Sequence, residues 1–200
     1  MAQIEMYLTN YPKGFDAKQL VVIWGGANDL RDVKNQVDLE TVVRNIVTAV
    51  ATTACSGAKY LVVPNSLNFS IAPAVPPSQA DQVKALILAY NNALKNAVTL
   101  LRNNPLTMTC GYKPKIYYVD LFSVGEALVQ ISKIFKVPYS NVSSPAVDIV
   151  KSIASNDFVL RAGVDPNTYL FLDTIHVTTP AQKVIAASVL DAIRQGNFGN

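Results

Sequence analysis

The chain has 200 residues, half of them hydrophobic, which is enough for one globular domain with its own core. Charged residues make up only 16%, the net charge is +3, and no run of lysine or arginine is long enough to indicate nucleic-acid binding. No apolar run approaches the roughly 20 residues that span a bilayer, and the first residues lack the basic and apolar regions of a signal peptide.

The chain begins with a short amphipathic segment that stops at Pro12. Three β-rich runs follow, at residues 19–24, 59–63 and 115–119, and each is apolar nearly throughout, as is typical of parallel strands covered on both faces. Helical patterns separate these runs, so the sequence predicts repeated strand–helix–strand units and a parallel sheet. Neither an internal repeat nor a linker divides the chain, so we expect a single α/β domain over residues 1–200.

Apolar periodicity and capping signals mark the first two helices between these strands. An apolar stripe over residues 39–50 predicts the first, with Asp38 as its N-cap. The second has an apolar stripe that runs to Leu101. It begins at Ser78, and Asp81 follows three residues later, which is the spacing of a capping box.

The C-terminal part of the chain ends in a clear helix signal. Thr179 is the expected N-cap, Pro180 the first helical residue, and Gly196 follows the last one. Residues 65–77 form a proline-rich loop after a strand end. Residues 138–167 have weak periodicity and are expected to be irregular, with a short helix.

Two cysteines, Cys55 and Cys110, are present, and neither belongs to a CxxC motif. Because His176 is the only histidine, the usual ligands of a zinc site are missing and we expect no metal. The cysteines would form one disulfide in an exported protein, or else remain two buried thiols. The sequence leaves both arrangements open, because it does not show whether the two residues approach each other.

The first polar motif, Gly25-Gly26-Ala27-Asn28-Asp29, directly follows the first predicted strand. Ligands of open parallel sheets bind beyond the carboxyl ends of the strands. The two glycines allow a tight turn and a close approach of the backbone. Asn28 is placed to aim a neutral amide donor into the cleft, which suits an oxyanion that forms only in the transition state. The alternative is that Asn28 and Asp29 cap the next helix.

The second polar motif, Asp173-Thr174-Ile175-His176, lies just before the last helix. A histidine that acts as general base for a serine needs a carboxylate on its other ring nitrogen. Asp173, three residues before His176 on a loop, can fold back to provide it. The alternative is a structural histidine near a helix start. No GxSxG, Walker A, GxGxxG or HExxH motif is present.

Together these motifs resemble the GDSL lipase and esterase family, the SGNH hydrolases, in the branch of bacterial phospholipases, acyltransferases and thermolabile haemolysins. Residues 21–30, Val-Val-Ile-Trp-Gly-Gly-Ala-Asn-Asp-Leu, resemble the third block of that family, with its Gly-x-Asn-Asp core. Residues 169–179 resemble the fifth block, with its Asp-x-x-His core, and residues 61–65 resemble the strand end between the two blocks. The resemblance extends from near residue 1 to about residue 195.

The resemblance implies a three-layer α/β/α sandwich with a parallel, flavodoxin-like sheet. It implies that Asn28 is an oxyanion-hole donor, His176 the general base and Asp173 its orienting carboxylate, in a cleft lined by Gly25, Gly26 and Asp29. It also implies a lipid or other carboxylic ester as substrate, no metal and no organic cofactor. A secreted or periplasmic location and transient contact with a membrane surface are further expectations of this kind.

Two departures from the family pattern matter. Val177 stands where the family often has proline, which is minor because Pro180 can set the helix start. The Gly-Asp-Ser-Leu block and the next block, with its glycine donor, are missing, and no serine of this chain matches the nucleophile. We therefore expect the C-terminal part of a longer enzyme, inactive alone. The alternatives are a non-catalytic relative and an unrecognised nucleophilic serine.

The missing blocks have a structural consequence. In the resembled family the nucleophile strand lies beside the strand predicted at residues 19–24. Without it, this apolar strand becomes an exposed sheet edge, and such edges pair with other chains. The sequence therefore predicts self-association of the isolated chain through this edge.

Overall fold

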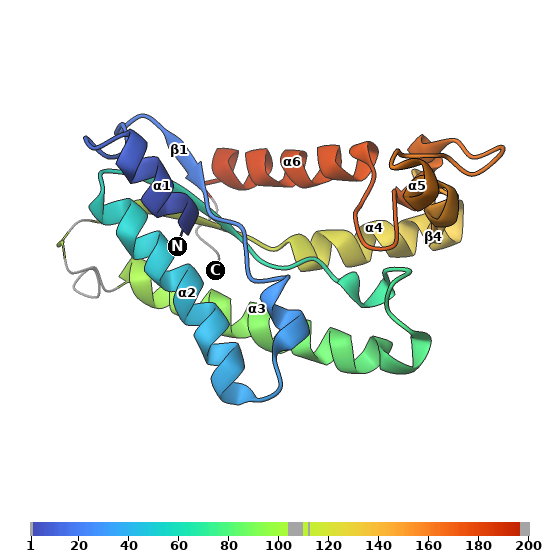
Figure 1. Ribbon diagram of the computed structural model, residues 1–200. Coiled ribbons are helices and arrows are strands. Elements are labelled where there is room, and N and C mark those ends of the chain that lie inside the picture. The colour runs from blue at the N-terminus through green and yellow to red at the C-terminus, as the bar shows by residue number, and fades with distance from the viewer. Residues whose placement is uncertain (1, 104–109, 112, 197–200) are drawn as a thin grey trace. The chain divides into compact units, whose positions relative to one another are not determined.

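The computed structural model describes residues 2–103, 110–111 and 113–196, and their fold is mixed α/β (Figure 1). These residues include six α-helices and two small parallel sheets. By their internal contacts they fall into two compact units, which we describe one at a time. Unit 1 comprises Met1–Ser66, Leu86–Asp120 and Val189–Asn200, and unit 2 comprises Leu67–Ala85 and Leu121–Ser188. The expected α/β class is confirmed, and the single domain stays a prediction.

The sheet of unit 1 has three parallel strands in the order β1-β2-β3. These are β1 (Leu20–Val22), β2 (Tyr60–Pro64) and β3 (Lys115–Val119), so all three predicted strands are confirmed, although β1 is shorter than expected. After their first residue β2 and β3 are buried throughout, as the absence of polar alternation indicates.

Strand β1 is not covered on both faces, and that prediction was wrong. Leu20, Val22 and Trp24 expose 45%, 50% and 48% of their surface. These residues alternate along the chain and therefore point to the same side. Among the described residues, β1 pairs only with β2, so the expected sheet edge is present.

This edge leads to a prediction about self-association. We expect the wild-type chain to show a mass above that of the monomer, rising with concentration, in analytical ultracentrifugation. Val22→Lys, which places a charge on the edge strand, should shift the chain towards the monomer. Val37→Lys is the matched control, because Val37 is an exposed valine on a helix of the same unit. Equal effects of both substitutions would show that the edge is not the contact.

Two helices of unit 1 lie side by side, α1 (Ala2–Asn10) and α2 (Gln36–Cys55) (Figure 1). Helix α1 ends before Pro12, as expected, but carries no buried residue. Helix α2 begins two residues before Asp38, so Asp38 is not its N-cap. The cap is Asn35, whose side chain accepts the Asp38 N–H.

Helix α3 (Ala80–Asn103) confirms the second predicted helix but not its start. The helix begins at Ala80, after a 3-10 turn, Pro77–Gln79, that contains Ser78. Proline fixes the backbone angle that a first turn requires, and Pro77 therefore starts this segment one residue before the expected cap.

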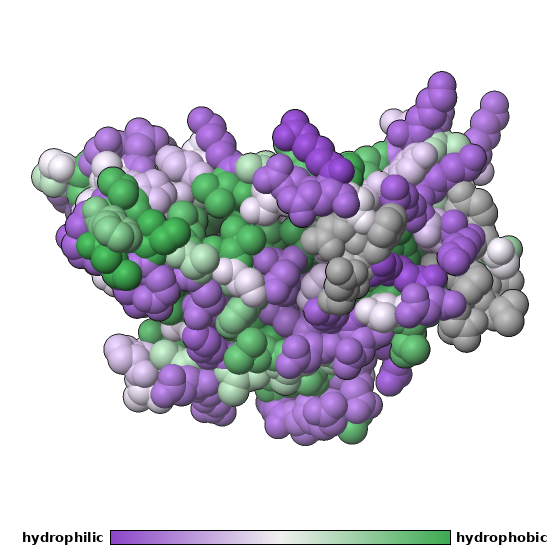
Figure 2. Space-filling model, turned by 180° about the vertical axis from the view of Figure 1, so that it is seen from behind, coloured by the Kyte–Doolittle hydropathy of each residue, from purple (hydrophilic) through white to green (hydrophobic). Residues whose placement is uncertain are grey.

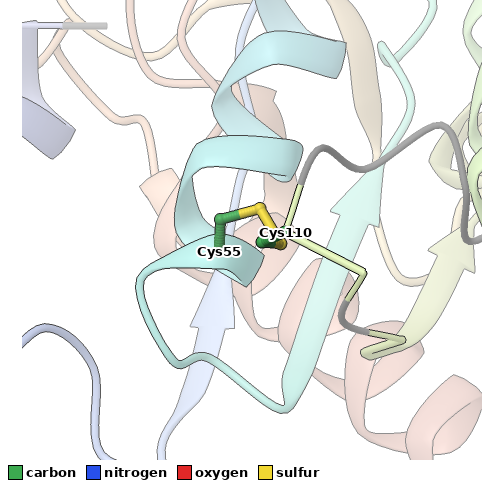
Figure 3. The surroundings of a disulfide bond; sticks show 2 residues. All are labelled: Cys55 and Cys110. Atoms are coloured by element: carbon green, nitrogen blue, oxygen red, sulfur yellow. A yellow bond between two sulfur atoms is a disulfide. The ribbon is translucent and has the colours of Figure 1, made fainter.

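A disulfide joins Cys55, the last residue of α2, to Cys110, so the two buried thiols are excluded (Figure 3). The Cα atoms of the two cysteines are 5.5 Å apart, within the usual range for such a bond.

Unit 2 contains α4 (Leu121–Phe135), β4 (Asn141–Pro145), α5 (Ile149–Ser155), β5 (Tyr169–Phe171) and the start of α6 (Thr179–Arg194). Strands β4 and β5 form a two-stranded parallel sheet. The short helix expected within residues 138–167 is confirmed as α5. The sequence reading missed α4, β4 and β5. The core of the unit is formed by Ala72, Val129, Tyr139, Leu170, Phe171 and Ala181.

Helix α6 begins at Thr179, so this residue is helical and not the N-cap. The carbonyl of Thr178 accepts the N–H of Gln182, which places Thr178 at the cap position. Its hydroxyl donates to the carbonyl of Tyr169 and ties the helix start to β5. Gly196 adopts a left-handed conformation after the helix, as expected for a C-terminal glycine.

Within the described ranges, no helix is long and apolar enough to cross a membrane. The same residues include no group of three or more histidine, cysteine, aspartate and glutamate side chains that could hold a metal ion.

Candidate functional site

The loop between β5 and α6 holds Asp173 and His176 against each other. Nδ1 of the imidazole lies 2.7 Å from Oδ2 of the carboxylate. The other carboxylate oxygen accepts the backbone N–H groups of Ile175 and His176, at 2.8 and 2.7 Å. The predicted contact between carboxylate and imidazole is therefore present, and three hydrogen bonds orient the carboxylate.

Backbone hydrogen bonds fix the shape of this loop. The N–H of Leu172 donates to the carbonyl of His176 at 2.8 Å, which closes the loop at its base. The N–H of Ala74 donates to the carbonyl of Thr174, also at 2.8 Å, and anchors the tip of the loop to a neighbouring segment of unit 2. A side chain on such a loop is held in place by backbone bonds, as a catalytic group requires.

The surroundings of Asp173 favour the ionised form of its carboxyl group. Burial by itself raises its pKa, but the backbone N–H groups of His176 and Ile175 and the imidazole of His176 outweigh burial, so the pKa lies below the ordinary 3.8. The carboxylate is thus charged at neutral pH, as the orienting partner of a general base must be.

The side of the His176 imidazole that faces away from Asp173 is accessible to solvent. The His176 side chain is 76% exposed. Because Asp173 holds Nδ1, a neutral imidazole carries its proton there and leaves Nε2 as the basic nitrogen. Among the described residues, no hydrogen-bond partner of Nε2 is seen. This arrangement can accept a proton from a hydroxyl group that approaches from outside unit 2.

The double glycine of unit 1 allows a close contact with a buried tyrosine. The Tyr90 hydroxyl donates to the Gly25 carbonyl at 3.0 Å, and Gly26 adopts a left-handed conformation with φ +89°. A Cβ on Gly26 would collide with the Tyr90 hydroxyl. Burial, together with Tyr118 and Asp29, raises the pKa of Tyr90 far above its ordinary value, so it stays a neutral donor.

This contact makes Gly26 a sensitive position. Gly26→Ala should lower the free energy of unfolding by about 1–2 kcal/mol for the left-handed backbone, plus about 1–3 kcal/mol for the clash. Gly163→Ala is the matched control, because Gly163 is also left-handed but would place its Cβ in open space. Urea denaturation of both variants measures the difference. Equal losses of stability in the two variants would show that the Tyr90 side chain moves aside at no cost in free energy.

Asn28 is exposed and directly precedes the 3-10 helix Asp29–Asp32. Asn28 occupies the N-cap position of this helix, as the alternative interpretation expects, but its side chain makes no capping hydrogen bond. Asn28 belongs to unit 1, whereas Asp173 and His176 belong to unit 2. The expectation that Asn28 and His176 face one cleft therefore stays a prediction.

Sequence reading missed a polar cluster at the carboxyl end of the unit 1 sheet. The Asn65 amide, directly after β2, donates to the Asp120 carboxylate, directly after β3, at 2.8 Å. The Trp24 indole donates to the Asn65 carbonyl at 3.1 Å. The Asn91 side chain accepts the N–H of Ser66 and donates to its carbonyl, both at 2.9 Å. The sequence did offer one signal for this cluster, namely a polar residue directly after each of two apolar strands, Asn65 after β2 and Asp120 after β3.

Sequence reading also missed an apolar cavity of about 80 Å³ within unit 2. Its walls come from α4, β5, α6, the segment around the 3-10 helix Phe69–Ile71, and the loop that carries the dyad. Ile175 and Val177, the two neighbours of His176 in the chain, both line it. Nothing in the sequence pattern marked these dispersed residues as one site.

Neither a scan against models of protein families nor a search of curated proteins found a match to this chain.

Proposed function

We propose that the chain is the C-terminal part of a serine ester hydrolase of the SGNH type, whose nucleophilic serine lies outside these 200 residues. The observation that carries this proposal is the contact of 2.7 Å between Asp173 and His176, on a braced loop that leaves Nε2 accessible. This is the arrangement that a general base for a serine hydroxyl requires.

The proposed mechanism assigns one step to each group. The serine hydroxyl attacks the ester carbonyl while Nε2 of His176 accepts its proton, and Asp173 stabilises the imidazolium that forms. The side-chain amide of Asn28 donates to the oxyanion of the tetrahedral intermediate. The imidazolium then protonates the leaving alcohol, and water hydrolyses the acyl-enzyme by the same steps.

The three-layer SGNH sandwich belongs to the same proposal. The free edge of β1, with its half-exposed apolar residues, is where the strand that carries the nucleophile would pair. That strand would place the serine beside the residues that follow β1, among them Asn28. The disulfide supports export of the protein, because such bonds persist in oxidising compartments.

A transient contact with a membrane surface fits a lipid substrate. Figure 2 shows apolar side chains gathered over the segments of unit 2 that Figure 1 labels α4, β4 and α5. Exposed apolar residues of these elements and their flanks are Ile131, Ile134, Phe135, Val137, Val150, Ile153 and Phe158. Lys133 and Lys136 are exposed neighbours of these residues in the chain and suit anionic headgroups.

The second candidate function is a binding or remnant domain of the same family without chemistry. The lack of a serine at Nε2 among the described residues favours it. The two candidates differ in what the gene encodes upstream of Met1. An in-frame Gly-Asp-Ser-Leu segment supports the hydrolase, whereas a stop codon close upstream supports the remnant.

Activity measurements complete the test. The 200-residue chain alone should show no turnover of a short-chain chromogenic ester, because without the serine only weak residual catalysis remains. The protein extended by its upstream segment should turn the ester over. Turnover by the 200-residue chain that disappears in His176→Ala would reveal a serine within this chain as the nucleophile. No turnover by an extended chain with Gly-Asp-Ser-Leu would refute the hydrolase.

A further inference from the structure

A pocket of unit 1 is lined by three cationic side chains. It has a volume of about 340 Å³ and lies between the end of α3 and the start of β3. The described residues that form its walls all belong to unit 1, and they are Arg102, Asn103, Lys113, Pro114, Lys115 and Ile116. These walls carry three positive charges and no negative one, so the pocket attracts anions.

The register of the sheet explains why lysines gather at this end of unit 1. Lys115 is the first residue of β3, and its backbone N–H donates to the carbonyl of Lys59, directly before β2, at 2.8 Å. Leu20, the first residue of β1, pairs with Tyr60, the first of β2, and Lys18 lies two residues before Leu20. Because parallel strands start at the same edge, each strand brings a lysine to the amino end of the sheet.

The positive charge at this edge is concentrated beside β3. At the start of β1, the carboxylate of Asp16 accepts the backbone N–H of Lys18 at 2.7 Å, so an acidic group accompanies that lysine. The walls of the pocket at β3, in contrast, include no acidic residue among those described. An anion that approaches the amino end of the sheet is therefore drawn towards the pocket.

Both lysines of the pocket are attached to fixed parts of the fold. Nζ of Lys115 lies 5.3 Å from the centre of the Tyr117 ring, which is a cation–π distance. Lys113 lies between β3 and Cys110, which the disulfide ties to Cys55 of α2. Cations that are already held near one another lose less conformational entropy when an anion binds.

Arg102 supplies directional hydrogen-bond donors. It lies in the last turn of α3, where its charge offsets the partial negative charge of the terminal carbonyls. Burial lowers the pKa of Arg102, because the guanidinium has lost part of its hydration, and the group still stays charged at neutral pH. A guanidinium can donate to two oxygens of one phosphate group at the same time, which a lysine cannot do.

The remaining walls favour a small soluble ligand. Sites for nucleic acids usually add aromatic side chains on which the bases stack, and no aromatic residue is among the described walls. A membrane site exposes hydrocarbon for insertion, but the two apolar residues here, Pro114 and Ile116, are buried. A volume of 340 Å³ is at the lower end of the roughly 300–1,000 Å³ of small-molecule sites.

We propose that this pocket binds a phosphorylated small molecule, with Arg102 donating to two phosphate oxygens and Lys113 and Lys115 neutralising the remaining charge. The site lies at the amino end of the unit 1 sheet, whereas Asn28 follows β1 at the carboxyl end, so one ligand does not occupy both places. The inference does not depend on the proposed function, because Asp173 and His176 take no part in it.

Titration of the 200-residue chain with sodium pyrophosphate tests the site. Calorimetry measures the affinity, and amide NMR shifts locate the contact. We expect a single saturable site, with the largest shifts at Asn103, Lys113, Lys115 and Ile116. Sodium chloride at the same ionic strength is the reference, and it should produce no saturable shift, because a monovalent ion without oxygens cannot accept the paired donors of Arg102.

Paired substitutions identify the residues that bind. Arg102→Gln should weaken pyrophosphate binding at least tenfold, because it removes the paired charge-assisted hydrogen bonds. Arg44→Gln makes the same change at an exposed arginine of α2 outside the pocket and should leave the affinity unchanged. Lys113→Gln should weaken binding about threefold. Because Lys113 is exposed and lies outside helices and strands, this variant keeps the test decisive if Arg102→Gln fails to fold.

Three outcomes would overturn the inference. Shifts that spread over lysines of both units without saturation would indicate general ion binding. Equal affinities of Arg102→Gln and Arg44→Gln, or an unchanged affinity in Lys113→Gln, would exclude the pocket. Vesicles of phosphatidylcholine with phosphatidic acid form the last arm, and binding to these vesicles without binding of pyrophosphate would replace the soluble ligand by a membrane surface.

Discussion

We expect His176→Ala to lower kcat for a short ester by about 10⁴-fold or more, with a much smaller change in KM, in a protein extended by the proposed upstream serine. The imidazole is the only one in the chain, and Asp173 holds it so that Nε2 faces solvent. Without it, the serine hydroxyl keeps its proton and attacks slowly. The measurement is the steady-state rate with a chromogenic ester.

A second variant separates the charge of Asp173 from its role in folding the loop. Asp173→Asn can still accept the N–H groups of Ile175 and His176 through its amide oxygen, but it no longer favours the proton on Nδ1. We expect a loss of kcat of about 10⁴-fold with little loss of stability. Thr174→Ala, in the same loop, is the control and should keep most of the activity. Unchanged kcat in His176→Ala would remove the dyad from the mechanism.

Reduction of the disulfide should lower the free energy of unfolding by about 4 kcal/mol. Cys55 and Cys110 are separated by 55 residues, and a cross-link of this span removes a large part of the chain entropy of the unfolded state. Small domains are stable by only about 5–15 kcal/mol, so the reduced chain should be close to unfolding. Urea titration with and without reductant measures the change.

The control for this experiment is the double variant Cys55→Ser with Cys110→Ser. It should start with the stability of the reduced wild type and show no further response to reductant. A wild-type chain that unfolds at the same urea concentration in both conditions would show that the bond contributes nothing in solution.

Several features were predicted from local sequence because local physics determines them. Strands β2 and β3 lie where runs without polar alternation indicated strands buried on both faces. The contact between Asp173 and His176 spans three residues of one loop, so its formation depends on short-range geometry. Helices α2 and α3 followed from their apolar stripes.

Helix starts were less predictable, because several residues compete for one cap. Asn35 and Asp38 are both good caps, and only one of them can occupy the N-cap position. Asn35 takes it, and the Asp38 carboxylate accepts the N–H of Lys34 instead. Their order along the chain gave no means of choosing between them.

Only the tertiary structure decided the remaining features. Helix α4 buries Leu121 and Val129 but exposes Ile131, Ile134 and Phe135, so hydrophobicity alone did not mark its buried face. Strand β1 pairs only with β2 among the described residues, and the residues of β1 do not encode which elements lie beside it or over its faces. The cavity gathers residues from five segments, and its volume depends on how their side chains pack. By itself the sequence determined which groups could perform chemistry, whereas packing decided what surrounds them.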